Sequence, residues 1–112
     1  RVFDCSLRRR FAFIEIEPAF NNLNFKRYME NKNEDLAESI IEKFVKLNED
    51  IENDPSLGGD FRIGHSYFCT PKHTLSKEEY KNIIQYEILP KIAEYWFNEP
   101  YRIKKWIKEL ME

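Results

Sequence analysis

The fold class follows most directly from residues 35–53, which read DLAESIIEKFVKLNEDIEN. Apolar residues recur there every three or four positions, which places them on one face of an α-helix. They are Leu36, Ile40, Ile41, Phe44, Leu47 and Ile51. Glu42 and Lys46 are spaced to form a favourable ion pair one turn apart. Because residues 54–59 contain a proline and two glycines, we expect one long helix that ends near Asn53.

Shorter helices are indicated on both sides of this segment. Asn22 or Asn24 can cap a short helix before it, because asparagine side chains accept bonds from free amides at a helix start. Residues 61–68, FRIGHSYF, predict a short helical turn. The run Ser76-Lys77-Glu78-Glu79 has the spacing of a capping box, which predicts a further helix beginning there.

Two prolines divide the C-terminal part of the chain. Pro90 should kink the helix before it or begin a new segment, because its ring removes one backbone donor. Asn98-Glu99-Pro100 predicts another helix start, with proline in the first turn. The apolar residues after it keep helical spacing and are Ile103, Trp106, Ile107, Leu110 and Met111. The predicted fold is therefore mainly α, with four or five helices.

Residues 11–17, FAFIEIE, predict a β-strand instead. Alternate residues of this run share a face, and Pro18 stops it. A strand needs a partner for its backbone hydrogen bonds, and no second convincing strand occurs in the sequence. We therefore expect an orphan strand whose sheet lies in another part of a larger protein. The absence of a methionine at position 1 agrees with that expectation.

The composition limits the classes of function. The 112 residues are 42% apolar and 15% aromatic, which is enough for a core, and the formal net charge is −2. Near-zero net charge argues against bulk nucleic-acid binding by this segment. No run approaches the length of a membrane span, and Cys5 and Cys69 do not form a disulfide-rich pattern. We expect a cytoplasmic protein with free thiols and no self-contained active site.

Two clusters carry candidate chemistry. Arg8-Arg9-Arg10 stands directly before the predicted strand, which would hold at least one guanidinium in a fixed position. A fixed arginine suits phosphate recognition, because its planar fork donates two bonds to phosphate oxygens, although short basic runs are often only solvated. His65, Cys69 and His73 recur every four residues, and Cys5 would complete a zinc set. Because Pro71 interrupts that run, we expect no metal site.

Three segments in order resemble the McrB family of AAA+ GTPases, the motor subunits of modification-dependent restriction systems. Residues 4–18, DCSLRRRFAFIEIEP, resemble the family's arginine triplet and following strand. Residues 59–68, GDFRIGHSYF, are similar to its lid signature, and residues 88–100 resemble its closing helices. The resemblance implies that residues 1–18 end an AAA+ αβ core and that residues 19–112 form an α-helical lid subdomain.

The resemblance also implies a function and partners. The parent protein would form a homo-oligomeric ring, hydrolyse GTP or ATP with Mg²⁺, and drive an McrC-like nuclease on DNA that carries 5-methylcytosine. The rest of the core would lie upstream in the same protein, and other domains would contact DNA. This chain alone would bind no cofactor and would not be an enzyme, whereas the parent would be an NTPase.

Site residues are implied by the same matches. Arg9 and Arg10, with Arg8 next, would be arginine fingers that neutralise charge on the γ-phosphate of a neighbouring subunit's nucleotide. Arg62 would be a sensor 2 arginine that contacts nucleotide in the same subunit. In an alternative alignment Phe68 replaces that arginine, and His65 or Tyr67 would line the nucleotide pocket instead.

A different class of function remains open on the sequence alone. The chain would then be a stand-alone helical protein–protein interaction module. Its partner would bind aromatic faces that contain Tyr95, Trp96 and Trp106.

Overall fold

The computed structural model describes residues 20–70, 72 and 74–112, and predictions about the remaining residues lie outside that range. The described part holds five α-helices and no strand, which confirms the mainly α prediction. The strand expected over residues 11–17 lies outside the described residues. The described residues up to Thr74 form one compact unit and Leu75–Glu112 another, so each is described by itself.

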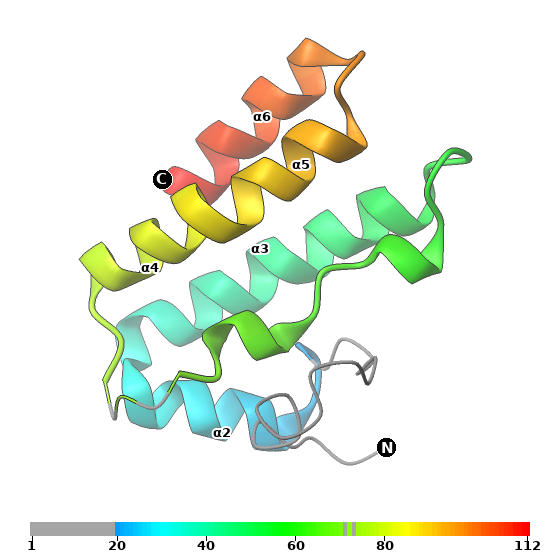
Figure 1. Cartoon of the computed structure of the whole chain (residues 1–112). Helices are drawn as coiled ribbons and strands as arrows, with labels where there is room; N and C mark the ends of the chain where they lie inside the picture. Colours follow the sequence, from blue (N-terminus) through cyan, green and yellow to red (C-terminus); the bar gives the residue numbers. More distant parts are fainter. Residues whose placement is uncertain (1–19, 71, 73) are drawn as a thin grey trace. The chain divides into compact units, whose positions relative to one another are not determined.

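The first unit begins with two helices that share one connecting residue. They are α2 (Leu23–Lys32) and α3 (Glu34–Glu52), and Figure 1 shows α3 running back along α2. Asn22 caps α2, as its side chain accepts a bond from the backbone amide of Asn24 at 2.8 Å. Asn33 ends α2 through its amide and caps α3 through its side chain, which accepts from the Leu36 amide at 3.1 Å. The tight connection follows from this double use of one asparagine.

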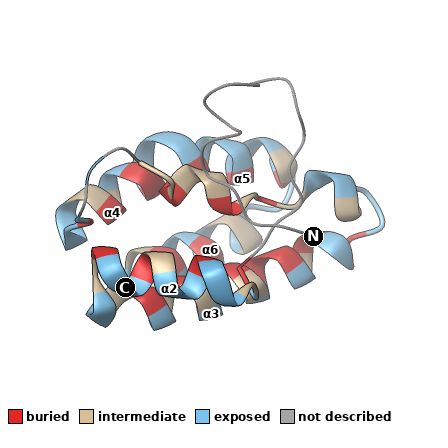
Figure 2. Cartoon of the chain, turned by 90° about the horizontal axis from the view of Figure 1, so that it is seen from below, coloured by how far each residue is buried: buried red, intermediate tan, exposed pale blue. Residues whose placement is uncertain are grey.

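An aromatic cluster forms the core of the first unit. Phe20 stacks on Phe44 with ring centroids 5.1 Å apart, and Phe68 meets Phe44 edge-on at the same distance. Phe25 packs edge-on against Phe20 at 5.4 Å. All four rings are buried. Buried and exposed positions alternate along α2 and α3 in Figure 2, as expected of helices with one face in a core. Edge-to-face and offset contacts are the arrangements that aromatic quadrupoles favour, so the cluster stabilises the α2–α3 pair.

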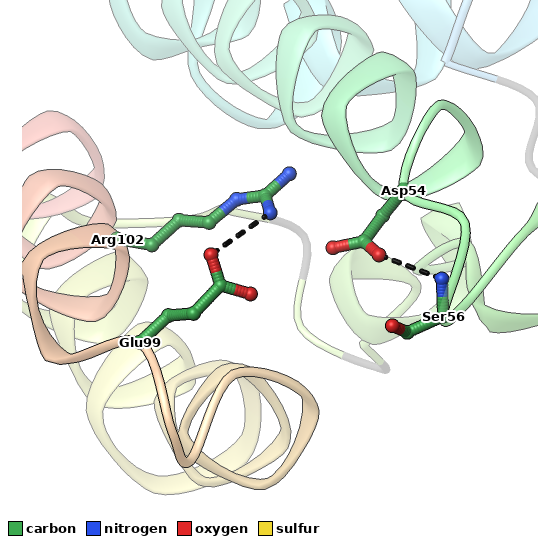
Figure 3. Close-up of polar contacts among 4 residues, drawn as sticks. All are labelled: Asp54, Ser56, Glu99 and Arg102. Carbon is green, nitrogen blue, oxygen red and sulfur yellow. Dashed lines mark hydrogen bonds and ion pairs between the residues drawn. The ribbon is translucent and has the colours of Figure 1, made fainter.

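A turn after α3 sends the chain back along that helix. The Asp54 carboxylate accepts a bond from the Ser56 amide at 2.8 Å, which closes the start of the turn (Figure 3). Gly58 has a φ of 88°, a conformation that residues with a Cβ rarely adopt. Two short 3₁₀ helices follow, η1 (Gly59–Phe61) and η2 (His65–Phe68). The single turn predicted over residues 61–68 is thus two turns with a break at residues 62–64.

The second unit is a long helical rod followed by a returning helix. The rod consists of α4 (Lys77–Ile83), the π-helical turn η3 (Ile84–Ile88) and α5 (Leu89–Tyr95), and α6 (Pro100–Met111) runs back beside it (Figure 1). The predicted capping box is present: Ser76 Oγ accepts from the Glu79 amide, and Glu79 Oε1 accepts from the Ser76 amide. Pro90 lies in the first turn of α5, so the predicted new segment starts there.

Three polar contacts fix α6 within this unit. The Tyr80 hydroxyl donates to the Leu110 carbonyl at 2.8 Å in a buried setting. The Arg102 guanidinium lies 4.3 Å from the ring centre of Trp96. It also pairs with the Glu99 carboxylate at 3.4 Å, as Figure 3 shows. In the described part of the chain, no helix is long and apolar enough to cross a membrane.

Candidate functional site

A pocket of about 230 Å³ in the first unit contains one of the predicted site residues, Arg62. Residues from α3, from the chain just before α2 and from the break between the two 3₁₀ helices line it. They are Phe20, Asn21, Val45, Asn48, Glu49, Glu52 and Arg62. The site therefore joins segments that lie about forty residues apart in the sequence.

The Arg62 side chain is held against its own loop. Its Nε donates to the Gly59 carbonyl at 2.8 Å. A Cβ at Gly59 would lie 3.7 Å from the same nitrogen, which is an ordinary van der Waals distance, so this contact does not itself require a glycine. Arg62 as a whole is half-buried.

Asn48 fixes the backbone beside Arg62. Its Nδ2 donates to the Ile63 carbonyl at 2.9 Å, and its Oδ1 accepts from the Ile63 amide at 2.6 Å. One side chain thus satisfies both polar groups of a buried residue, as a neighbouring strand would. Asn48 was not singled out from the sequence, although a polar residue on the apolar face of the 35–53 helix was a visible signal.

The charges of the pocket limit what it can bind. Glu49 and Glu52 are exposed carboxylates at its wall, and Arg62 supplies one positive charge. A phosphate placed inside the pocket would face both carboxylates at short range, which is unfavourable. We therefore expect any phosphate contact of Arg62 to occur at the solvent edge of the pocket.

His65 and Tyr67 do not line this pocket. His65 is only 1% exposed and packs edge-on against Phe25 at 5.4 Å and Phe20 at 6.4 Å. Burial lowers the pKa of His65 to about 4, so its ring is neutral at pH 7. Tyr67 on η2 is partly exposed. Of the lid-side residues predicted from the sequence, the structure therefore brings only Arg62 to the pocket.

The other predicted sites are only partly covered by the structure. Arg8, Arg9 and Arg10 lie outside the described residues, so their roles stay predictions. Cys5 and His73 of the candidate zinc set also lie outside them. In the described ranges, no three or more His, Cys, Asp or Glu side chains are arranged to hold a metal ion. Cys69 Sγ lies 4.0 Å from the His65 carbonyl oxygen. The prediction of free thiols also involves Cys5, which lies outside the described residues.

The aromatic faces proposed for an interaction module are largely inaccessible. Trp96 is 1% exposed and Trp106 is 4% exposed, so both belong to the interior. Other aromatic side chains are exposed in the second unit, namely Tyr86, Phe97 and Tyr101. An interaction module built on the two tryptophans is therefore not supported.

The described residues form an all-helical domain with five α-helices. The family described as "McrB, alpha-helical lid domain" matches residues 39–104, which is more than half of the chain, and the chain belongs to this family. A similar protein is the "Type IV methyl-directed restriction enzyme EcoKMcrB subunit" of Escherichia coli (strain K12). It is 40% identical over 116 aligned residues, which cover 98% of this chain. The chain spans about a quarter of that protein's length. The family expected from the sequence is confirmed.

Proposed function

We propose that this chain is the lid of a nucleotide-hydrolysing motor subunit that serves methyl-directed DNA restriction. The observation that carries the proposal is the family match together with 40% identity to the restriction subunit over nearly the whole chain. The parent protein hydrolyses GTP or ATP with Mg²⁺ in the cytoplasm. It assembles as a homo-oligomeric ring and drives an McrC-like nuclease, while its other domains contact DNA.

The arginine triplet supplies the catalytic contribution of this chain. Arg9 and Arg10, with Arg8 next, reach the nucleotide of the neighbouring subunit. Their guanidinium groups stabilise the charge on the γ-phosphate oxygens as the bond to the leaving group breaks. An arginine finger of this kind contributes about 10³–10⁵ in rate.

Arg62 supplies the contact from the lid to the nucleotide of its own subunit. This part of the proposal is supported by the three hydrogen bonds that hold its loop, one from Arg62 Nε to the Gly59 carbonyl and two between Asn48 and the Ile63 backbone. A guanidinium that is already ordered loses little side-chain entropy when it binds phosphate. Tyr67, on η2, is partly exposed and therefore accessible to a bound nucleotide. His65 lies in the core and supports the same segment.

The experiment measures GTP and ATP hydrolysis by the full-length protein. Arg9→Ala and Arg10→Ala should lower kcat by about 10³-fold or more while nucleotide binding is retained. Arg27→Ala, at an exposed position of α2, is the matched control and should leave hydrolysis unchanged. Specific activity should rise with protein concentration, because an arginine that acts on a neighbour requires assembly.

Two results would contradict the proposal. Absence of turnover with either nucleotide would refute the motor function. Full activity in Arg8→Ala, Arg9→Ala and Arg10→Ala alike would refute the role of the triplet. The 112-residue chain on its own should hydrolyse neither nucleotide, and steady turnover that is lost on Arg9→Ala would also count against the proposal.

A further inference from the structure

Asn48 interrupts the buried face of α3. The other buried residues of that helix are Ala37, Ile40, Phe44, Leu47 and Ile51. An amide at such a position costs free energy unless both of its ends are hydrogen-bonded. Both ends are bonded here, and both to the same residue, Ile63, which lies fifteen positions along the chain. The amide therefore fixes the position of one backbone unit, which an apolar residue at position 48 would not do.

The backbone that Asn48 holds belongs to Ile63, which directly follows Arg62 in the chain. On one side of Arg62, its own Nε is bonded to the Gly59 carbonyl. On the other side, Ile63 is bonded to Asn48 at 2.6 and 2.9 Å. Asn48 also lines the same pocket as Arg62. The backbone of Arg62 is thus held on both sides. The orientation of its side chain therefore depends on the side-chain amide of Asn48.

We propose that Asn48 is a positioning residue that holds Arg62 in the orientation in which it contacts the nucleotide. The inference rests on the proposed function, in which Arg62 makes that contact. Asn48 does not touch the nucleotide. It acts through the Ile63 backbone, so its contribution exists only while Arg62 is present.

The experiment is a double-mutant cycle in the full-length protein, with steady-state kinetics on GTP and, in parallel, on ATP. The variants are Asn48→Leu, Arg62→Ala and the two combined. Asn48→Leu keeps the size of the side chain and removes both bonds to Ile63. A misplacement of about 1 Å costs as much as 10²-fold, so we expect kcat/KM to fall by about 10- to 100-fold. Asn82→Leu, at an exposed position of α4, is the matched control and should have no effect.

Non-additivity separates positioning from general stability. In the Arg62→Ala background, Asn48→Leu should lower kcat/KM by less than about twofold, because the residue through which it acts is already gone. If Asn48 had only a structural role, Asn48→Leu would lower the melting temperature and would reduce kcat/KM by the same factor in the wild-type and Arg62→Ala backgrounds. All variants are assayed at least 15 °C below the lowest melting temperature of the set.

A second variant covers the case in which Asn48→Leu fails to fold. Asn48→Thr keeps one neutral hydroxyl, which can bond to only one of the two Ile63 backbone groups, so its effect should lie between wild type and Asn48→Leu. Additive effects, or unchanged kcat/KM in both Asn48 variants, would overturn the inference. An active protein in which Arg62→Ala changes nothing would overturn it too and leave the motor proposal standing. Wild-type protein that hydrolyses neither nucleotide would instead refute the proposed function.

Discussion

Lys32 offers the sharpest test of what stabilises the first unit. Its side chain is only 7% exposed, and its ammonium group donates to three oxygens. These are the Thr70 carbonyl at 2.9 Å, Thr70 Oγ1 at 2.6 Å and the Lys72 carbonyl at 2.7 Å. The ammonium also lies 5.1 Å from the ring centre of Tyr28. All three of its donors are therefore used, which is how a buried ammonium becomes tolerable.

We expect Lys32→Met to lower the free energy of unfolding by about 2–3 kcal/mol. A hydrogen bond that involves a charged group is worth about 1.5–3 kcal/mol. The sum over three bonds is smaller than three times that value, because Thr70 and Lys72 are partly or fully exposed and their oxygens regain water. The methionine retains the apolar stem over Tyr28, so little packing is lost.

The assay is urea unfolding of the 112-residue chain followed by circular dichroism. Tryptophan fluorescence serves as a second probe. It reports on the second unit, where Trp96 and Trp106 both lie, whereas Lys32 belongs to the first unit. The matched control is Lys26→Met at an exposed position of the same helix, which should stay within about 0.5 kcal/mol of wild type. If Lys32→Met unfolds at the same urea concentration as Lys26→Met, the three bonds contribute no net stability and the reasoning fails.

Three further predictions concern His65, Tyr80 and Ser76. Burial lowers the pKa of His65 from 6.5 to about 4, so its contribution to stability is complete above pH 6.5 and is lost as the pH falls toward 4. We expect a slope of up to about 1.4 kcal/mol per pH unit in urea unfolding between pH 6.5 and 5, and a flat profile in His65→Phe would confirm it. Tyr80→Phe removes the buried bond to Leu110 and should cost about 1 kcal/mol by thermal unfolding, whereas an equal loss in the exposed Tyr86→Phe would contradict this. Ser76→Ala removes the capping bond from the Glu79 amide and should lower the free energy of unfolding by about 1 kcal/mol. Ser76→Thr, which keeps the hydroxyl, is the conservative control. Faster hydrogen exchange of the amides in the first turn of α4 would show the loss.

Local signals predicted the helices well. The 35–53 pattern corresponds to α3, Glu34–Glu52, within one residue at each end. Of the two predicted candidates, Asn22 and Asn24, the structure uses Asn22 as the cap of α2. The predicted Ser76 capping box is present. Each of these features depends on residues within one helical turn of each other, so the sequence alone contains the necessary information.

The candidate site could not be predicted in the same way. The pocket needs Asn48 to meet Ile63, and that contact depends on the turn at Gly58, which sends the chain back along α3. Sequence spacing does not reveal such a return path. Trp96 and Trp106 illustrate the same limit, because their positions fit a helix face but only the packing of the second unit shows that both are buried.

The π-helical turn before Pro90 has an evolutionary consequence. The Leu89 amide bonds to the Ile84 carbonyl five residues back, so the turn holds one residue more than an α-helical turn would. A proline in an uninterrupted α-helix would clash with the carbonyl four residues before it, whereas the wider turn accommodates the ring. The extra residue and the proline therefore form one inherited unit. We expect homologous sequences that lack the insertion within residues 84–88 to lack Pro90 as well, and an alignment of many such sequences would show the two changes occurring together.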